Sequence, residues 1–154
     1  MPGLTDKIIS SLKSGCAEEV NDALTNAAYL FEKANNTSGK DETWTDEVKK
    51  AKIEASEIEK LKVNLIEFVE NNLAKEFEDP AVWALGKCFD SNLKPFFINA
   101  IKRSLNEGTS SFYQAMIALN NLGEDFFGKT SWSIIDEHEN RELAKRYLKH
   151  IEVE

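Results

Sequence analysis

The residues best suited to chemistry in this sequence are two histidines, two cysteines and several clusters of carboxylates. His138 lies in the segment DEHEN, and His150 lies near the C-terminal end. A zinc site needs several ligands brought together. Asp136, His138 and Glu139 are close in sequence, but among these three only Asp136 and Glu139 are separated by one helical turn. We therefore expect no metal site, and we expect His138 at an exposed loop or helix end.

Nucleophilic and acid–base chemistry are equally poorly supported. Cys16 and Cys88 form no CxxC pair, and no Cys–His or Ser–His pair has supporting context. Cys88 lies among apolar residues, which predicts a buried, reduced thiol. The segments KEFED and GED contain acids that a hydrolase could use in pairs, but surface acids are far commoner. There is no GxGxxG and no phosphate-binding loop. The sequence predicts a protein without enzymatic activity or a cofactor.

The charge balance bears on the kind of partner. The 154 residues carry 27 acidic and 19 basic side chains, a formal net charge of −8. Phosphate contacts need Lys and Arg, so nucleic-acid binding is disfavoured, whereas a basic protein would be attracted. The alternative is that the charge serves solubility alone. No apolar run approaches the roughly 18 residues of a membrane span, and no signal peptide is evident, so we expect a cytoplasmic protein, preferably monomeric.

Helical spacing of apolar residues runs through nearly the whole chain, which predicts one all-α domain. Residues 1–34 are expected to form two helices, the first capped by Thr5 and ended by Gly15. The apolar residues of the second recur at three- and four-residue steps: Val20, Leu24, Ala27, Ala28 and Phe31. The polar segment 35–43 is a predicted loop.

Residues 45–76 are predicted to form one long helix, straight or kinked. A single apolar stripe follows it: Val48, Ala51, Ala55, Ile58, Leu61, Leu65, Phe68 and Val69. The other faces of its first half carry charges of mixed sign, which is typical of a solvated helix face rather than a coiled-coil surface.

Five helical segments are predicted beyond residue 78. The first begins with Asp79 as its cap and Pro80 in the first turn. The others cover 91–107, 109–122, 131–139 and 140–153, the last capped by Asn140. The segment 91–107 is apolar over a wide arc, which indicates packing from more than one direction.

Two of these segments echo each other at a shift of 37 residues. AVWALGKCF at 81–89 matches ALNNLGEDF at 118–126 at the alanine, leucine, glycine and phenylalanine positions, with Val82 opposite Leu119. The matches step along one helical face, and the shift is close to the size of a two-helix repeat. We expect Val82, Leu85 and Phe89 to face the core together, as we do Phe112, Met116 and Leu119.

At these residues the sequence resembles HEAT-type helical repeats. The resemblance is carried by Asp79-Pro80-Ala81-Val82, Ala84-Leu85-Gly86, Asp90 and Leu93-Lys94-Pro95-Phe96-Phe97. The resemblance covers 79–135, and residues 1–75 show no copy of the repeat. The second copy lacks the Leu-x-Pro. In the first copy, Trp83 stands at the position after the valine, where these repeats often have an arginine. The resemblance implies a HEAT-like stack of antiparallel helix pairs closed by 140–153, with an irregular helical bundle as the alternative.

Helical stacks present extended binding surfaces. Trp83 and Tyr113 each lie about 100° round their helices from a core-facing residue, so the two copies place them on comparable faces. Aromatic residues beside acids make good interface contacts, although both could instead pack against neighbouring helices. The predicted partner-binding residues are Trp83, Tyr113, Glu78, Asp79, Asp90, Asn120, Glu124, Asp125 and Asp136.

The resemblance, together with the small size and acidity, implies an immunity protein that binds a basic, nuclease-type bacterial toxin. This is an analogy at the level of the fold. One alternative is a scaffold or adaptor for another cellular protein, acting through the charged helix at 45–76. The other is an accessory lyase of the kind found among HEAT proteins, which would need a deep pocket around Cys88 or His138.

Overall fold

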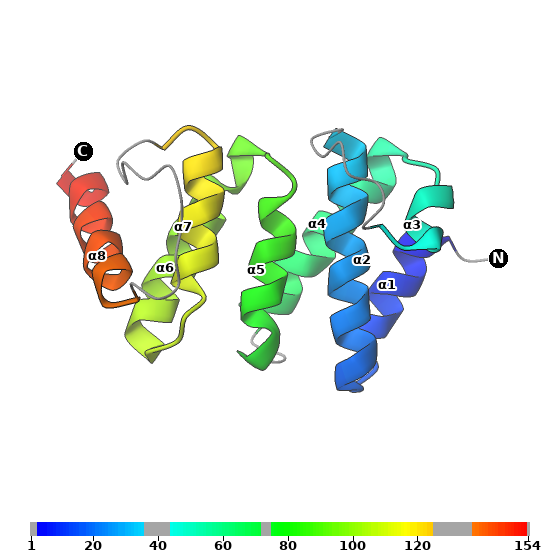
Figure 1. The fold of residues 1–154 in the computed structure, drawn as a ribbon, viewed down its shortest axis with the longest axis horizontal. Coiled ribbons are helices and arrows are strands. Elements are labelled where there is room, and N and C mark those ends of the chain that lie inside the picture. The colour runs from blue at the N-terminus through cyan, green and yellow to red at the C-terminus, as the bar shows by residue number, and fades with distance from the viewer. Residues whose placement is uncertain (1–2, 36–43, 72–74, 125–136, 154) are drawn as a thin grey trace. The chain divides into compact units, whose positions relative to one another are not determined.

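The computed structural model describes residues 3–35, 44–71, 75–124 and 137–153. Every regular element in these ranges is a helix, so the predicted all-α class is confirmed (Figure 1). The chain divides into two compact units, Met1–Cys88 and Phe89–Glu154, which are described in turn. The HEAT-like arrangement itself stays a prediction.

The first unit is built around one central helix. Its elements are α1 (Leu4–Leu12), α2 (Ala17–Asn35), α3 (Asp46–Lys50), α4 (Ala55–Glu70), the 3-10 turn η2 (Lys75–Phe77) and α5 (Glu78–Gly86). Helix α2 contacts α1, α3, α4 and α5. The five stripe residues predicted for it are all buried, because the apolar face of α2 is covered by its neighbours.

The predicted cap of the first helix is wrong. Gly3 stands at the N-cap position of α1, and Thr5 lies inside the helix with 8% of its surface exposed. Thr5, Ile8 and Leu12 are buried together at steps of three and four. The buried face of the helix therefore begins one turn earlier than the apolar residues indicate, and it includes the threonine.

The predicted long helix at 45–76 is interrupted. Helix α3 ends at Lys50, α4 begins at Ala55, and Ala51 has extended backbone (φ −66°, ψ 139°). The ammonium of Lys33 on α2 donates to the carbonyl oxygens of Val48, Lys49 and Ala51 at 3.1, 2.9 and 2.6 Å. A continuous helix would use these oxygens for its own N–H groups, so Lys33 stabilises the break. Helix α4 also ends earlier than predicted, at Glu70.

The second unit contains the 3-10 turn η3 (Ser91–Leu93), α6 (Lys94–Glu107), α7 (Phe112–Asn121) and α8 (Glu137–Val153). Helix α6 contacts both α7 and α8, which agrees with its wide apolar arc. It ends at Gly108, whose φ of 75° suits glycine and closes the helix. The side chains that fill this core include Phe97, Ile101, Phe112, Met116, Leu119 and Tyr147.

The start of the last helix differs from the prediction. Asn140 does not cap α8; it lies within the helix and is fully buried. The helix begins at Glu137, where acidic side chains favour its N-terminus. Asn140 then falls on the buried face with Ala144 and Tyr147. Of the predicted segment 131–139, residues 131–136 lie outside the described residues.

The echo between 81–89 and 118–126 holds in its first half only. Ala81 and Val82 are buried in α5, as Ala118 and Leu119 are in α7. Leu85 is also buried, but Phe89 is 41% exposed with φ of +49°. The expectation that Phe89 faces the core with Val82 is wrong, because the chain leaves the helix at Gly86 and turns before this residue. Phe126 lies outside the described residues.

Candidate functional site

Three of the predicted partner-binding residues lie on α5, and two of them are acids with little access to solvent. Glu78 is only 4% exposed and Asp79 is half-buried. Burial, assisted by the neighbouring Glu78, raises the pKa of Asp79 above its usual range. These two carboxylates therefore belong to the packed edge of the first unit more than to a surface that a partner could reach.

The third, Trp83, belongs to a polar cluster formed with Lys87, Glu32 and Trp44, here called the indole cluster. The ammonium of Lys87 lies 5.6 Å from the centre of the Trp83 ring and 3.5 Å from the Glu32 carboxylate. The same carboxylate accepts a hydrogen bond from the indole N–H of Trp44 at 3.1 Å. Trp83 is half-buried, so this cluster leaves part of the ring for a partner.

The remaining predicted residues belong to the second unit. Asp90 caps η3 by accepting a hydrogen bond from the Asn92 N–H at 3.0 Å. Glu124 lies 3.5 Å from the ammonium of Lys94 and accepts a bond from the Tyr147 hydroxyl at 3.3 Å. Tyr113 and Asn120 are half-buried on α7. Asp125 and Asp136 lie outside the described residues.

The predicted residues therefore fall into two groups, one in each unit. Two of the described acids serve the fold: Asp90 holds a turn, and Glu124 links α6 to α8 through Lys94 and Tyr147. A charge reversal at Glu124 would disturb the packing of the second unit. It would consequently be a poor probe of partner binding by itself.

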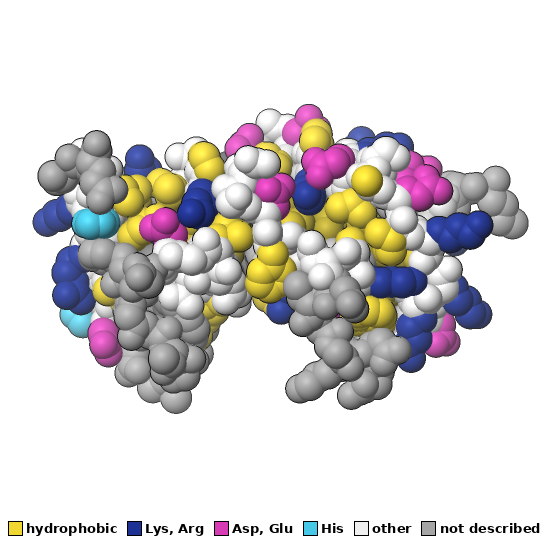
Figure 2. Space-filling view, turned by 90° about the horizontal axis from the view of Figure 1, so that it is seen from above, with side chains coloured by type: hydrophobic (Ala, Val, Ile, Leu, Met, Phe, Trp, Pro, Cys, Tyr) yellow, Lys and Arg dark blue, Asp and Glu magenta, His cyan; other side chains and the backbone are white. Residues whose placement is uncertain are grey.

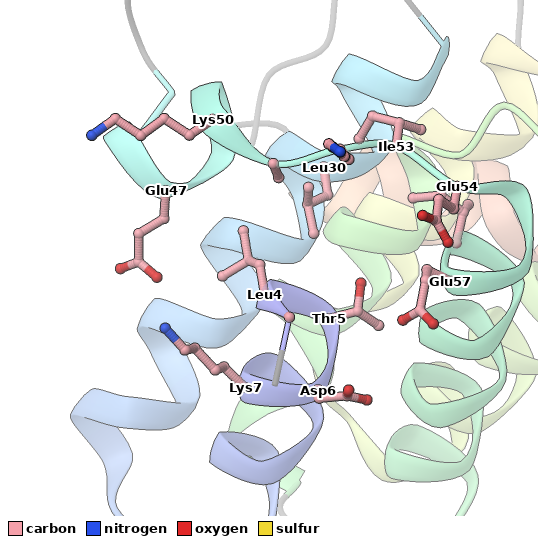
Figure 3. Close-up of a pocket in the computed structure, with 14 residues that line it drawn as sticks. Leu4, Thr5, Asp6, Lys7, Leu30, Glu47, Lys50, Ile53, Glu54 and Glu57 are labelled. Carbon is pink, nitrogen blue, oxygen red and sulfur yellow. The ribbon is translucent and has the colours of Figure 1, made fainter. Parts of the chain in front are cut away.

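A groove in the first unit was not predicted from the sequence. It lies where the start of α1, the C-terminal half of α2, helix α3, the segment 51–54 and the start of α4 meet (Figure 3). We call it the α1–α4 groove; it has a volume of about 470 Å³. Its apolar lining includes Leu4, Leu30, Ile53 and Ile58, and its charged lining consists of Asp6, Lys7, Glu47, Lys50, Lys52, Glu54 and Glu57.

The sequence did not reveal this groove because no local pattern marks the helix break that forms it. The groove exists because α3 and α4 are separate helices, and that break depends on Lys33, 15 to 18 residues away in the chain. The residues around the break are good helix formers. Ile53, 36% exposed, would have been read as one more residue on a continuous helix.

Charges are distributed unevenly along the groove. Figure 3 shows the Thr5 hydroxyl and the carboxylates of Glu54 and Glu57 at one end, and the ammonium groups of Lys7 and Lys50 turned away from it. Asp6 is already paired with Lys60 at 2.8 Å, and this hydrogen bond raises the pKa of Lys60.

The described residues contain no cluster of three His, Cys, Asp or Glu side chains that could hold a metal ion, and the groove lining contains neither histidine nor cysteine. Cys88 is buried, as predicted, and Cys16 is exposed; neither forms a disulfide. On the face seen in Figure 2, acidic and basic side chains are interspersed with hydrophobic ones.

The chain matches no protein-family model, no curated protein and no solved structure. Within the ranges that the structure describes, no helix is both long and apolar enough to cross a membrane.

Proposed function

We propose that this chain is a non-enzymatic protein-binding module for a basic partner, and specifically an immunity protein that neutralises a nuclease-type toxin. The observation that supports binding is the α1–α4 groove, with an aliphatic lining and carboxylates gathered at one end. Binding sites are typically apolar hollows of about 300–1,000 Å³ with a few polar groups. The toxin class is inferred from the HEAT-like resemblance and the acidity.

The net charge of −8 supports the basic character of the partner. An acidic protein raises the local concentration of a basic one and increases the rate of encounter. Nucleases that bind phosphates carry Lys and Arg at their active sites. A tightly bound acidic module would cover such a site and exclude the nucleic acid.

The proposal is tested by recovering the partner. The tagged protein, expressed in its native cells, should co-purify at low salt with a basic protein that degrades nucleic acid, and adding the pure protein should inhibit that degradation. A tagged, unrelated protein of equal net charge serves as the control. If the control protein retains the same basic proteins, or if the pure module does not inhibit the nuclease activity of the recovered partner, the immunity function is wrong.

A scaffold or adaptor would give a different result. It would retain a partner specifically without inhibiting any nuclease. Val63 on α4 is 52% exposed, and a substitution there, Val63→Ser, should weaken an adaptor contact made by the outer face of α4. The toxin interaction through the groove should be unchanged by this substitution.

A further inference from the structure

One end of the α1–α4 groove contains a hydroxyl that the described chain does not use. Thr5 is 8% exposed, and its side chain makes no hydrogen bond to any described residue. Although the residue as a whole is largely covered, its hydroxyl is not one of the fully buried unpaired atoms, so the open groove reaches it. The Thr5 hydroxyl points into the groove (Figure 3), so a polar atom of a ligand could reach it.

The carboxylates of Glu54 and Glu57 face the same space (Figure 3). Among the described residues, no cation forms an ion pair with either one. The N-termini of α1 and α4 also meet here, and each contributes about half a positive charge. Asp6 and Lys60 cancel each other as a pair. Lys60 also interacts electrostatically with Glu57, but Glu54 and Glu57 remain the two carboxylates that face this end of the groove, and a cation placed between them would be attracted by both.

The apolar lining next to these groups defines the shape of the ligand. Leu4, Leu30 and Ile53 lie beside the acidic end of the groove (Figure 3). Lysine and arginine have this combination, because their aliphatic stems cover apolar surface while the charged head contacts polar groups. A free metal ion would leave the aliphatic part of the lining without a contact.

We propose that this end of the groove receives one lysine or arginine side chain of the basic partner. The charged head contacts Glu54, Glu57 and the Thr5 hydroxyl, and the stem lies on Leu4 and Ile53. This inference rests on the proposed function and adds the chemistry of the contact.

Lys52 is the internal competitor for this position. It lines the groove, is exposed, and has no ion pair with a described residue. If its ammonium swings into the acidic end, it must leave when the partner's side chain enters. Lys52→Met should then strengthen binding of a cationic probe, and it should never weaken it.

The test uses the full-length protein and two small probes, the N-acetyl methylamides of lysine and arginine. Amide NMR shifts of Thr5, Glu54 and Glu57 should saturate with a millimolar Kd for at least one probe. The Nε-acetyl form of the lysine probe, which lacks the charge, should produce no such shifts. Glu57→Gln should weaken binding about fivefold, as expected for a partly exposed charge pair, and Glu54→Gln with Glu57→Gln should abolish it.

Two further variants separate the site from general effects. Thr5→Val keeps the shape of the buried side chain and should weaken binding about threefold through the lost hydrogen bond. Glu67→Gln removes an equal charge from an exposed position on the same helix and should leave the probe affinity unchanged. Probes that shift no groove amide, or that bind the double glutamine variant as well as the native protein, would overturn the inference.

The same variants distinguish this inference from the proposed function. If a basic partner is retained and inhibited by the double glutamine variant with native affinity, the protein is an inhibitor but the groove is not its lysine or arginine site. If the probes bind the groove but no basic protein is recovered, the cation site stands and the immunity function fails.

Discussion

Phe89 has the backbone conformation least suited to its side chain. Its φ of +49° lies in the left-handed region, which costs about 1–2 kcal/mol for a residue with a Cβ atom. Both Phe89→Gly and Phe89→Ala remove the ring, but only glycine relieves the backbone strain. The free energy of unfolding of Phe89→Gly should therefore be about 1 kcal/mol higher than that of Phe89→Ala. Urea denaturation of the two variants measures this difference. Equal stabilities would mean that the backbone here is not strained.

Asp79 makes the stability of the first unit depend on pH. Its pKa is raised in the folded protein, first by burial and then by Glu78. The folded state therefore holds the proton more tightly than the unfolded state, and charging the group destabilises the fold. This cost is absent below the unfolded pKa and reaches its full size once the pH exceeds the raised pKa.

The corresponding substitution removes the cost. Asp79→Asn should raise the melting temperature at pH 7, and the gain should shrink as the pH falls toward 4. The same change at the exposed Asp46, in the first turn of α3, should bring no gain at pH 7. Thermal unfolding at several pH values distinguishes them; a lower melting temperature for Asp79→Asn at pH 7 would contradict the expected sign.

Among the elements, the break between α3 and α4 depends on Lys33. Lys33→Met removes three charge-assisted hydrogen bonds while keeping most of the stem. We expect a loss of about 2–3 kcal/mol in the free energy of unfolding, the order of a hydrogen bond to a charged group. Hydrogen exchange at residues 51–57 should become faster. Lys49→Met, at an exposed neighbouring position, is the control, and similar exchange in the two variants would exclude this role for Lys33.

Helix bounds were predictable where local signals agree. Helix α2 was expected at 17–34 and spans Ala17–Asn35, because acids mark its start and its stripe is buried throughout. Helix α6 ends at Glu107, as predicted, with Gly108 as its C-cap. Thr5 and Asn140 were misread because both residue types favour caps, yet tertiary packing buries them within their helices. The α3–α4 break arises from a tertiary contact, which no local pattern contains.

The candidate site was less predictable than the helices. The acids near Trp83 and Tyr113 were chosen by proximity in sequence, but Glu78 is buried and Glu124 is bonded to Tyr147. Glu54 and Glu57 have carboxylates that face the open groove. Their sequence segment, however, predicts only an ordinary charged helix face. Whether an acid is free for a partner depends on which side chains surround it in space.

At the scale of the whole molecule, the net charge of −8 should govern how fast the proposed basic partner associates. Raising the ionic strength from about 0.05 to 0.5 M shortens the screening length several-fold, so the association rate should fall about tenfold or more. The dissociation rate should change little, because it depends on desolvated contacts. Surface plasmon resonance with the recovered partner separates the two rates, and an association rate insensitive to salt would exclude electrostatic steering.

The contact made by Lys33 also bears on how this scaffold could evolve. Its ammonium bonds to main-chain oxygens of Val48, Lys49 and Ala51, and every residue type supplies such an oxygen. Side chains at 52–54 can therefore change without weakening the anchor that fixes their backbone. A family of paralogues could share this frame and differ at those positions, each matched to another partner, as variable loops on a rigid framework are.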